Sequence, residues 1–375
     1  MRSARLIEAT ERGLFCEAGG FYIDPWKPVD RAVVTHGHSD HATWGCARYL
    51  CSAPGVGVLK ERVHAGARIE GAGYGESVLI NGVKVSLHPA GHVLGSAQVR
   101  VEHGGRVEVV TGDYKVVVGG EAAGGDATCA GFEVVGCDRL ITECTFGLPI
   151  YRWRPEGEVA AEIDGWWRGN VENGRTSVVF AYALGKAQRV LSMVDRGLCE
   201  EHGVVVHGSV KRFVDVYRDA GVDLPAVSTS TEASRARVKG KGLVVAPPSV
   251  LGTPWLKKFG PYSTAFASGW MAVRGNRRRR GVDRGFVVSD HVDWAGLMGV
   301  IEATGASEVG ATHGYVDEVA RYLNEQGEVE ADVVATRYEG EGGDEREGAG
   351  EEEVGGGAGP TDGVRGLRGE EAGEA

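Results

Sequence analysis

Four side chains of the kind that bind metals crowd into one short stretch, THGHSDHATWG, directly after an apolar run. They are His36, His38, Asp40 and His41. Buried together without a partner, three imidazoles and a carboxylate would incur a large desolvation cost. On a loop at the end of a strand they could instead converge on a cation, since neutral imidazole and carboxylate suit zinc and manganese. A solvated polar turn or a single structural zinc site is the alternative that this stretch alone leaves open.

Three more residues of this kind follow other apolar runs along the chain. His92 lies in PAGHVLGSA, Asp113 ends the run VVTGDY, and His313 follows the run EVGAT. The glycines around His92 would let the backbone approach closely, and a carboxylate at position 113 could bridge two metals. The whole set predicts a dinuclear metal site on one rim of a sheet.

The elements that must hold these side chains are short strands joined by glycine turns. In the first third of the chain, GLFCE and FYIDP flank one glycine pair, and AQVRVEH and RVEVVTG flank another, which predicts two antiparallel hairpins. RAVVTH, KVSLHPA and RLITE are further β-type runs. After about residue 282 the same style returns, with GFVVSDH, EVGATHG and helices expected over 294–304 and 316–324.

The middle of the chain has a different pattern. Helical spacing of apolar residues begins at Glu158 and again at Leu184, where one helix is expected to run through the segment LGKAQRVLSMVDRGL. These segments alternate with SVVFAYA, GVVVHGS and GLVVAPP, which indicates an α/β unit with a parallel sheet. We therefore expect one domain divided into residues 1–157 and 283–338, with an α/β domain inserted at 158–282.

Composition and charge narrow the possible partners. The chain has 375 residues, 41 basic and 52 acidic side chains, a formal net charge of −11 and 60 glycines. Residues 339–375 hold 12 of the acidic residues, three of the basic ones, 13 glycines and no aromatic residue, so we expect a disordered acidic tail there. Without this segment the net charge is only −2, which does not argue against a nucleic-acid partner.

Other features bear on the compartment. No apolar run reaches the roughly 18 residues that could span a bilayer, and charges interrupt the first residues where a secretory signal would be apolar. The seven cysteines are scattered and form no CxxC pair, which favours a reducing compartment. These features predict a cytoplasmic protein with no membrane partner.

Taken in order, the motifs HGHSDH, AGH, TGD and THG resemble those of the metallo-β-lactamase superfamily. The resemblance implies an α/β fold, a four-layer αββα sandwich with two divalent metal ions, zinc or manganese, at one edge. An acid that orients the histidine loop would be Asp24, although an Asx turn before Pro25 would also account for it. The ligands that the resemblance implies are His36, His38 and His92 for one metal, Asp40, His41 and His313 for the other, and Asp113 as the bridge.

Further motifs resemble the β-CASP nucleases of this superfamily. TECTFG carries Glu143 at their acidic motif, FAYALGKAQRVL is similar to the start of their inserted domain, and SDHVDW carries His291 at their second motif. His313 matches their third motif. The stretch ASGWMAVRGNRRRRGVDRGFVVSDHVDW is similar to the signature of bacterial ligase-associated DNA exonucleases. Those enzymes accompany an ATP-dependent DNA ligase and a helicase in repair-type operons.

The resemblance thus implies a metal-dependent DNA exonuclease that acts in DNA repair on single strands or strand ends, by attack of a metal-held hydroxide on phosphorus. Catalytic roles fall to Asp40, His291 and Glu143. His291 would protonate or polarise the leaving oxygen, and Glu143 would orient His291 or bind a metal-linked water. An ordinary loop histidine and a surface ion-pair partner are the structural alternatives for these two residues.

A run of four arginines supplies the strongest basic patch: Arg277, Arg278, Arg279 and Arg280. Guanidinium forks bind phosphate oxygens, so the run points to a polyanion, with a solvated loop as the alternative. Three aromatic residues, Trp255, Tyr262 and Trp270, precede the run and could stack on unpaired bases, although we expect at least two of them in the core.

Three other functions stay open. The third-motif histidine is typical of RNA-processing β-CASP enzymes, such as those similar to mRNA 3′-end processing factors, so RNA is the main alternative substrate. A small-molecule metallo-hydrolase of the superfamily, such as a glyoxalase-type thioesterase, would not need the inserted domain or the arginine run. A non-catalytic nucleic-acid-binding relative would commonly lack metal ligands, whereas all seven positions are filled here.

Overall fold

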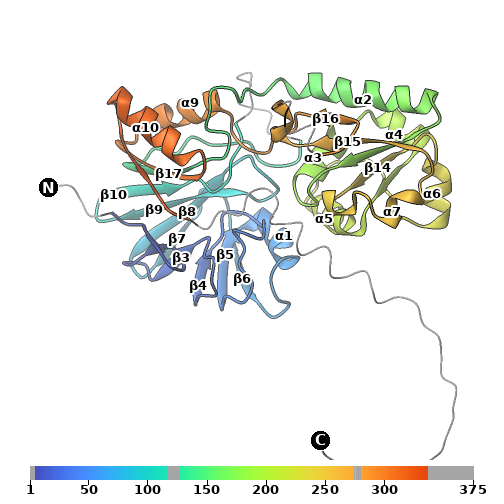
Figure 1. Ribbon diagram of the computed structural model, residues 1–375. Helices are drawn as coiled ribbons and strands as arrows, with labels where there is room; N and C mark the ends of the chain where they lie inside the picture. Colours follow the sequence, from blue (N-terminus) through green and yellow to red (C-terminus); the bar gives the residue numbers. More distant parts are fainter. Residues whose placement is uncertain (1–4, 117–126, 274, 276–279, 337–375) are drawn as a thin grey trace, which may run out of the picture.

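The computed structural model describes residues 5–116, 127–273, 275 and 280–336, which form a mixed α/β fold with three β-sheets (Figure 1). The tail expected at 339–375 and Arg277, Arg278 and Arg279 lie outside the described residues. None of the described helices is long and apolar enough to cross a membrane.

Two sheets are built from the N-terminal part of the chain and the segment after residue 307. The first has the order β1-β2-β3-β4-β5-β6. Its strands are β1 (Glu8–Thr10), β2 (Gly13–Cys16), β3 (Phe21–Ile23), β4 (Arg31–Val33), β5 (Arg48–Ser52) and β6 (Arg68–Ala72). The second has the order β18-β17-β11-β10-β9-β8-β7. Its strands are β18 (Glu330–Val333), β17 (Glu308–Gly314), β11 (Arg139–Cys144), β10 (Arg106–Val110), β9 (Ala97–His103), β8 (Val83–Pro89) and β7 (Ser77–Ile80).

These two sheets share one apolar core, to which each contributes alternate residues, such as Phe21 and Ile23 from β3 and Val99 and Val101 from β9. Helices α9 (Trp294–Thr304) and α10 (Val316–Gln326) pack on the second sheet, and α1 (Val56–Lys60) packs with residues of β4 and β5. We call this part of the molecule the two-sheet body.

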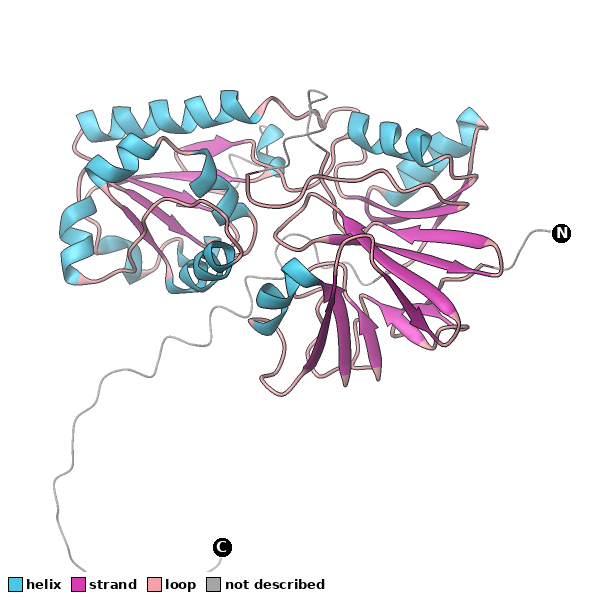
Figure 2. Ribbon diagram, turned by 180° about the vertical axis from the view of Figure 1, so that it is seen from behind, coloured by secondary structure: helices cyan, strands magenta, loops and turns pink. Residues whose placement is uncertain are grey.

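The third sheet is formed between residues 176 and 286 and is parallel throughout, in the order β13-β14-β12-β15-β16. Its strands are β12 (Thr176–Phe180), β13 (Val204–Val206), β14 (Leu243–Ala246), β15 (Tyr262–Ala267) and β16 (Arg284–Phe286). Its helices are α2 (Glu156–Glu172), α3 (Lys186–Met193), α4 (Arg196–His202), α5 (Gly208–Asp219), α6 (Glu232–Val238) and α7 (Pro254–Lys257). We call this part the third-sheet lobe; it lies beside the two-sheet body in both views (Figures 1 and 2).

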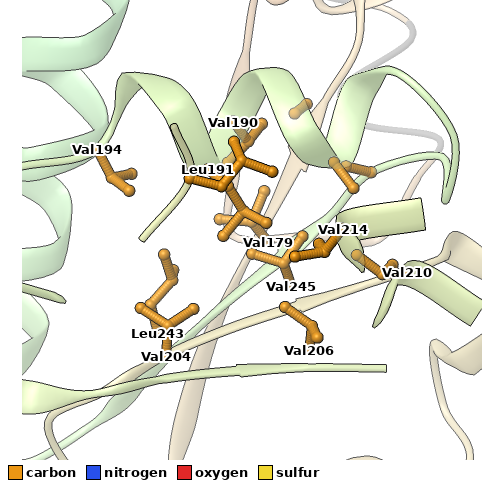
Figure 3. Close-up of a cluster of buried hydrophobic side chains, with 14 of the residues drawn as sticks. Val179, Val190, Leu191, Val194, Val204, Val206, Val210, Val214, Leu243 and Val245 are labelled. Carbon is orange, nitrogen blue, oxygen red and sulfur yellow. The ribbon is translucent and has the colours of Figure 1, made fainter. Parts of the chain in front are cut away.

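Valine and leucine side chains hold the third-sheet lobe together. Val190 and Leu191 of α3 and Val210 and Val214 of α5 pack on strand residues such as Val179, as Figure 3 shows. Because the sheet is parallel and covered on both faces, its strands are apolar on both sides. Burying each valine or leucine side chain contributes about 1.5–3 kcal/mol to the stability of this lobe.

Most of the expected elements are present. β2 and β3 form one antiparallel hairpin and β9 and β10 the other, and a helix covers 294–304 as predicted. One expectation was wrong, because the segment from Leu184 forms two helices instead of one. α3 ends at Met193, and Asp195 caps α4 by accepting a hydrogen bond from the Leu198 backbone N–H. An aspartate at this position favours a new helix start over continuation.

Candidate metal centre

The predicted ligand residues gather where neighbouring strands end. β10, β11 and β17 are parallel neighbours in the second sheet. Asp113 follows β10, Glu143 lies near the end of β11, and His313 lies near the end of β17. The loop that begins after β4 carries the HGHSDH residues to the same place. Because carboxyl ends of parallel strands meet at one edge of a sheet, residues far apart in the sequence come together there.

One group of possible ligand atoms comes from His36, His38, His92 and Asp113, and these atoms all lie within 4.8 Å of one another. His38 Nδ1 lies 3.0 Å from His36 Nε2 and 3.1 Å from His92 Nε2. Asp113 Oδ2 lies 3.5 Å from His36 Nε2 and 3.8 Å from His92 Nε2. Four donor atoms so arranged could surround one cation.

Asp113 also belongs to a second group, with His41 and His313. Its Oδ2 lies 3.6 Å from His41 Nε2, and its Oδ1 lies 3.4 Å from His313 Nδ1. Asp40 borders this group, with Oδ2 3.8 Å from His41 Nε2. Asp113 therefore touches both groups, which is the position that a bridging carboxylate needs.

Hydrogen bonds on the outer side of the rings fix which nitrogen faces inward. His92 Nδ1 donates to the Asp290 carbonyl oxygen at 2.8 Å, and His38 Nε2 donates to the Leu184 carbonyl oxygen at 3.3 Å. A carbonyl oxygen can only accept, so these nitrogens carry the protons of the neutral rings. The inward nitrogens, His92 Nε2 and His38 Nδ1, are then left with lone pairs.

Asp24 fixes the orientation of the other two rings of the loop, those of His41 and His36. Its Oδ2 accepts a hydrogen bond from His41 Nδ1 at 2.7 Å and another from Thr35 Oγ1 at 2.6 Å, while its Oδ1 accepts from the Thr35 backbone N–H at 2.8 Å. Because the Thr35 hydroxyl proton points to Asp24, its oxygen can accept from His36 Nδ1, 3.1 Å away. Asp24 thus contacts residues 11 and 17 positions away, which an Asx turn would not do.

A third group lies beside the first two and consists of Asp113, Glu143 and His291. His291 Nδ1 donates to Glu143 Oε2 at 2.8 Å, and Glu143 Oε1 accepts from the Tyr114 backbone N–H at 2.8 Å. Glu143 and His291 are both buried, so neither is a solvated surface group. With Nδ1 held by Glu143, Nε2 is the ring nitrogen that can exchange a proton with a substrate.

The pKa values of the histidines diverge. Burial, and after it the neighbouring imidazoles, lowers the pKa of His36 and of His92 well below the usual value. Burial also acts to lower the pKa of His41, but three carboxylates, Asp113 first, outweigh it and raise that pKa to about 10. The centre therefore attracts one positive charge to His41 and keeps the rings of His36 and His92 neutral.

These observations fit divalent cations. His41 Nε2 is buried without a hydrogen-bond partner. Lone pairs that face one another repel unless a cation lies between them, and imidazole nitrogen with carboxylate oxygen is a ligand set that suits zinc and manganese. The residues present can therefore hold metal ions, with Asp113 reaching both groups.

A buried ion network reaches the centre from the third-sheet lobe. Arg189, in α3, donates Nε to Asp290 Oδ1 at 2.5 Å and Nη2 to the His92 carbonyl oxygen at 3.0 Å. Lys186 Nζ lies 3.3 Å from Asp290 Oδ2. Burial acts to raise the pKa of Asp290, but Lys186 and Arg189 outweigh it and lower that pKa far below its usual range. Since Asp290 also accepts the ring proton of His92, this network holds both the backbone and the ring of a predicted ligand.

Sequence reasoning did not assign Lys186, Arg189 or Asp290 any role. All three lie inside motifs that were noticed, GKAQRVL and SDHVDW, but Arg189 and Asp290 are 101 positions apart. The sequence did contain one signal: Lys186 and Arg189 lie in a helix whose other residues are mostly apolar. Since Lys and Arg are almost never fully buried unless they are paired, such positions indicate a buried ion pair.

The arginine run can be described only at its end. The Arg280 guanidinium lies over the Phe266 ring, 4.4 Å from its centroid. The three aromatic residues before the run, Trp255, Tyr262 and Trp270, are half-buried and pack against the apolar cluster on one face of the third sheet. They border the core, whereas we expected at least two of them inside it.

Comparisons with known proteins find relatives that are named as nucleases and one that is named as a ligase. No family model matches the chain. A protein of Opitutus terrae named "Probable DNA ligase" is 31% identical over 318 residues, which are 84% of this chain and 30% of that protein. The "RNase J-like protein" of Methanocaldococcus jannaschii is 26% identical over 51% of this chain, and "Endoribonuclease YSH1" of Yarrowia lipolytica is 31% identical over 44% of it. The chain spans 50% and 23% of the lengths of these two proteins.

A solved structure shares the fold at low identity. It is a protein of unknown function from Enterococcus faecalis, with a TM-score of 0.54 and 12% identity over 82% of this chain and 80% of that one. The site is a cluster of buried histidines and carboxylates at a sheet edge, and the relatives include RNase J-like and YSH1 endoribonuclease proteins. In its motifs and in this site the chain is similar to the nucleases of the β-CASP family, which belongs to the metallo-β-lactamase superfamily.

Proposed function

We propose that the chain is a metal-dependent phosphodiesterase, a DNA exonuclease of the ligase-associated type that acts in DNA repair. The observation that carries this proposal is the convergence of inward-facing ring nitrogens on Asp113, next to the buried His291–Glu143 pair. A phosphodiester at this place would meet a cation site and a proton donor together.

Each residue has a separate task in this proposal. One cation would be held by His36, His38 and His92 and the other by Asp40, His41 and His313, with Asp113 shared between them. Two divalent cations, when bound, would lower the pKa of a water molecule and neutralise phosphate charge.

The proton transfer falls to His291. Its Nε2 would donate a proton to the leaving oxygen, and the Glu143 carboxylate on Nδ1 would stabilise the positive charge of the protonated ring beforehand. Asp24 and Asp290 would keep the ligand rings turned inward, by accepting the protons on their outer nitrogens.

DNA as the substrate is supported by the Opitutus terrae relative. That protein is named a probable DNA ligase, and its similarity to this chain covers 30% of its length and 84% of ours. The similarity of this chain to part of a protein named as a ligase supports a task in DNA repair and an association with an ATP-dependent DNA ligase. A helicase partner belongs to the same proposal.

RNA is the second candidate substrate, for a specific reason. His313 lies in the second ligand group, 3.4 Å from Asp113, and a histidine at this motif is typical of RNA-processing members of the family. The relatives named RNase J-like protein and endoribonuclease favour the same substrate. An RNA-processing β-CASP ribonuclease is therefore our alternative proposal.

The finer architecture and compartment are also proposals. The two-sheet body would be the four-layer αββα sandwich, and the third-sheet lobe would be the inserted β-CASP domain. We place the domain boundaries at 1–157 and 283–338 for the sandwich and 158–282 for the insertion, although β16 (Arg284–Phe286) still pairs with the third sheet just after this boundary. Zinc or manganese would be the metal. All seven cysteines are unpaired, which supports a reducing, cytoplasmic location.

One assay tests substrate and polarity together. DNA and RNA strands labelled at the 5′ or the 3′ end are incubated with the protein and zinc or manganese, beside the variant Asp40→Ala. Asp30→Ala, which removes an exposed carboxylate paired with Arg48, is the matched control. We expect a ladder of shortened DNA with the unaltered protein and with Asp30→Ala, and none with Asp40→Ala. Degradation of RNA alone would favour the alternative, and intact strands of both kinds would contradict nuclease activity.

A further inference from the structure

α1 of the two-sheet body and α5 of the third-sheet lobe lie side by side (Figure 1). A Cβ atom on Gly57 of α1 would lie 3.0 Å from Val216 Cγ1 of α5, so the two helices are in contact. Shortly after α1, Arg62 Nε donates to the Gly37 carbonyl oxygen at 2.9 Å. Gly37 lies between the first two histidines of the metal loop. We call the contact between α1 and α5, together with Arg62, the α1–α5 seam; through Gly37 it adjoins the metal centre.

Two guanidinium groups cover one aromatic ring at the seam. Arg62 Cζ lies 4.9 Å and Arg212 Cζ 4.8 Å from the centroid of the Phe213 ring. Phe213 is fully buried in the core of the third-sheet lobe, so it is a fixed platform. A guanidinium that stacks on a ring keeps its N–H donors for another partner while its plane is held in place.

Arg212 lacks the anion that such a group needs. Among the residues that the structure describes, it makes no ion pair, and its Nε atom is buried without a hydrogen-bond partner. Its neighbour in α5, Lys211, is paired with Asp215 at 2.5 Å. Burying a charged group without a hydrogen-bond acceptor costs free energy of folding. Arg212 is thus held in place by its stacking on Phe213 and still lacks an acceptor.

We propose that Arg212, together with Arg62, binds a backbone phosphate of the substrate strand at the α1–α5 seam, outside the histidine cluster. This inference rests on the proposed nuclease function. Guanidinium N–H groups match the oxygens of a phosphate, and a contact to the backbone is independent of base sequence. Lys60, in the last turn of α1 and two residues before Arg62, is exposed and adds a further positive charge to this segment. A strand that reaches the seam gains this contact, whereas a one-phosphate substrate bound at the metal centre cannot.

The test compares a long and a minimal substrate on the intact metal-loaded protein. Initial rates are measured with a 20-nucleotide thymidine strand and with bis(p-nitrophenyl) phosphate, for the unaltered protein, Arg212→Ala and Arg212→Lys. The control variant is Arg175→Ala, which removes an exposed arginine directly before β12, at the opposite end of the third sheet from the metal centre. Melting curves are recorded for each variant.

We expect the ratio of kcat/KM for the strand to that for bis(p-nitrophenyl) phosphate to fall roughly tenfold in Arg212→Ala, mainly through KM, and to stay constant in Arg175→Ala. Arg212→Lys should recover part of the loss, since it keeps the charge without the fork. The slope of log KM for the strand against log salt concentration should fall by about 0.7, the value for one phosphate contact to a single strand.

Two results would overturn the inference, and they differ. If both substrates are hydrolysed and Arg212→Ala changes their ratio no more than Arg175→Ala does, the seam binds no phosphate and the proposed function stands. If the unaltered protein hydrolyses bis(p-nitrophenyl) phosphate but does not act on DNA or RNA strands, the nuclease proposal itself fails, and the seam inference fails with it.

Discussion

Two buried polar clusters lie side by side in this protein and meet at His92 and Asp290. The ion network around Asp290 is balanced in the sense that each charge has a partner of opposite sign. Asp290 accepts from Arg189 and lies 3.3 Å from Lys186, and Glu156 lies 3.1 Å from Arg189. The histidine cluster is not balanced. Its ring nitrogens donate outward and turn lone pairs inward, and His41 Nε2 has no hydrogen-bond partner.

The contrast separates groups that support a site from groups that form it. A buried cluster in which every charge has a partner of opposite sign can fix the geometry of its neighbours. A buried cluster that presents several acceptors to one point is stable only with a cation or a proton at that point. This difference predicts which variants lose chemistry and which lose stability.

The largest effect is expected from the unbalanced cluster. His41→Ala removes a ligand nitrogen, and because bound cations contribute several kcal/mol to stabilising the transition state, we expect hydrolysis of strands to fall by on the order of 10³. Melting curves of the metal-free protein separate this loss of chemistry from a loss of stability. His103→Ala, at an exposed hairpin tip, is the matched control. Activity within tenfold of the unaltered protein would contradict a metal role for His41.

Disruption of the balanced network should lower stability more than it lowers the rate of hydrolysis. Asp290→Ala leaves Lys186 and Arg189 buried without their carboxylate, so we expect the free energy of unfolding to fall by about 3–5 kcal/mol. Urea denaturation measures this change. Asp223→Ala, which removes an exposed partner of Arg196, should cost less than about 1 kcal/mol. Equal effects of the two variants would show that the buried network contributes no more than a surface pair.

The carboxylate that orients the loop should have an intermediate effect. Asp24→Ala leaves every predicted ligand in place but removes the acceptor for His41 Nδ1 and Thr35 Oγ1. Loss of such an outer contact weakens metal binding by about 10–100-fold. Competition with a chromophoric chelator measures this affinity. A change below threefold would mean that packing alone orients the rings.

The smallest effect concerns protons. In the metal-free fold the pKa of His41 is raised from 6.5 to about 10, so between these values the folded state binds one more proton than the unfolded state. This contribution to stability is complete below about pH 6.5 and is lost as the pH rises towards 10. At pH 8, zinc or manganese must displace that proton, so we expect release of about one proton per protein.

Calorimetric titration in buffers of different ionisation enthalpy measures the protons released. His41→Gln, which has no titrating ring, should release about one proton fewer than the unaltered protein. The same release from both proteins would mean that His41 is already neutral in the metal-free fold, and that the two clusters are less different than the geometry indicates.

The ligand residues were accessible from the sequence because each lies just after an apolar run or near its end. A strand that is buried on both faces reads as apolar, and its carboxyl end is where side chains can reach a common point. That is why His92, Asp113 and His313 could be predicted to meet. The separation into two helices after Leu184 was missed, because the apolar spacing continues across Asp195 and only the capping hydrogen bond marks the break.

The charged partners of the site were not accessible in the same way. Arg189 and Asp290 are 101 positions apart, and a sequence contains many arginines and aspartates that could pair. Arg212 is likewise an ordinary surface arginine in the sequence. Its buried, unpartnered Nε and the second guanidinium, that of Arg62, on the same Phe213 ring are properties of the packed structure alone.

The sequence by itself determined which residues could bind metal, and in what order they occur, because residue type and position after an apolar run are local properties. The tertiary structure decided which nitrogen of each histidine faces inward, which carboxylate is shared, and which cations are paired. Those properties depend on contacts between residues up to 200 positions apart, such as Asp113 and His313. A hydrogen bond or an ion pair requires particular distances and directions, which only the packed sheets and helices supply.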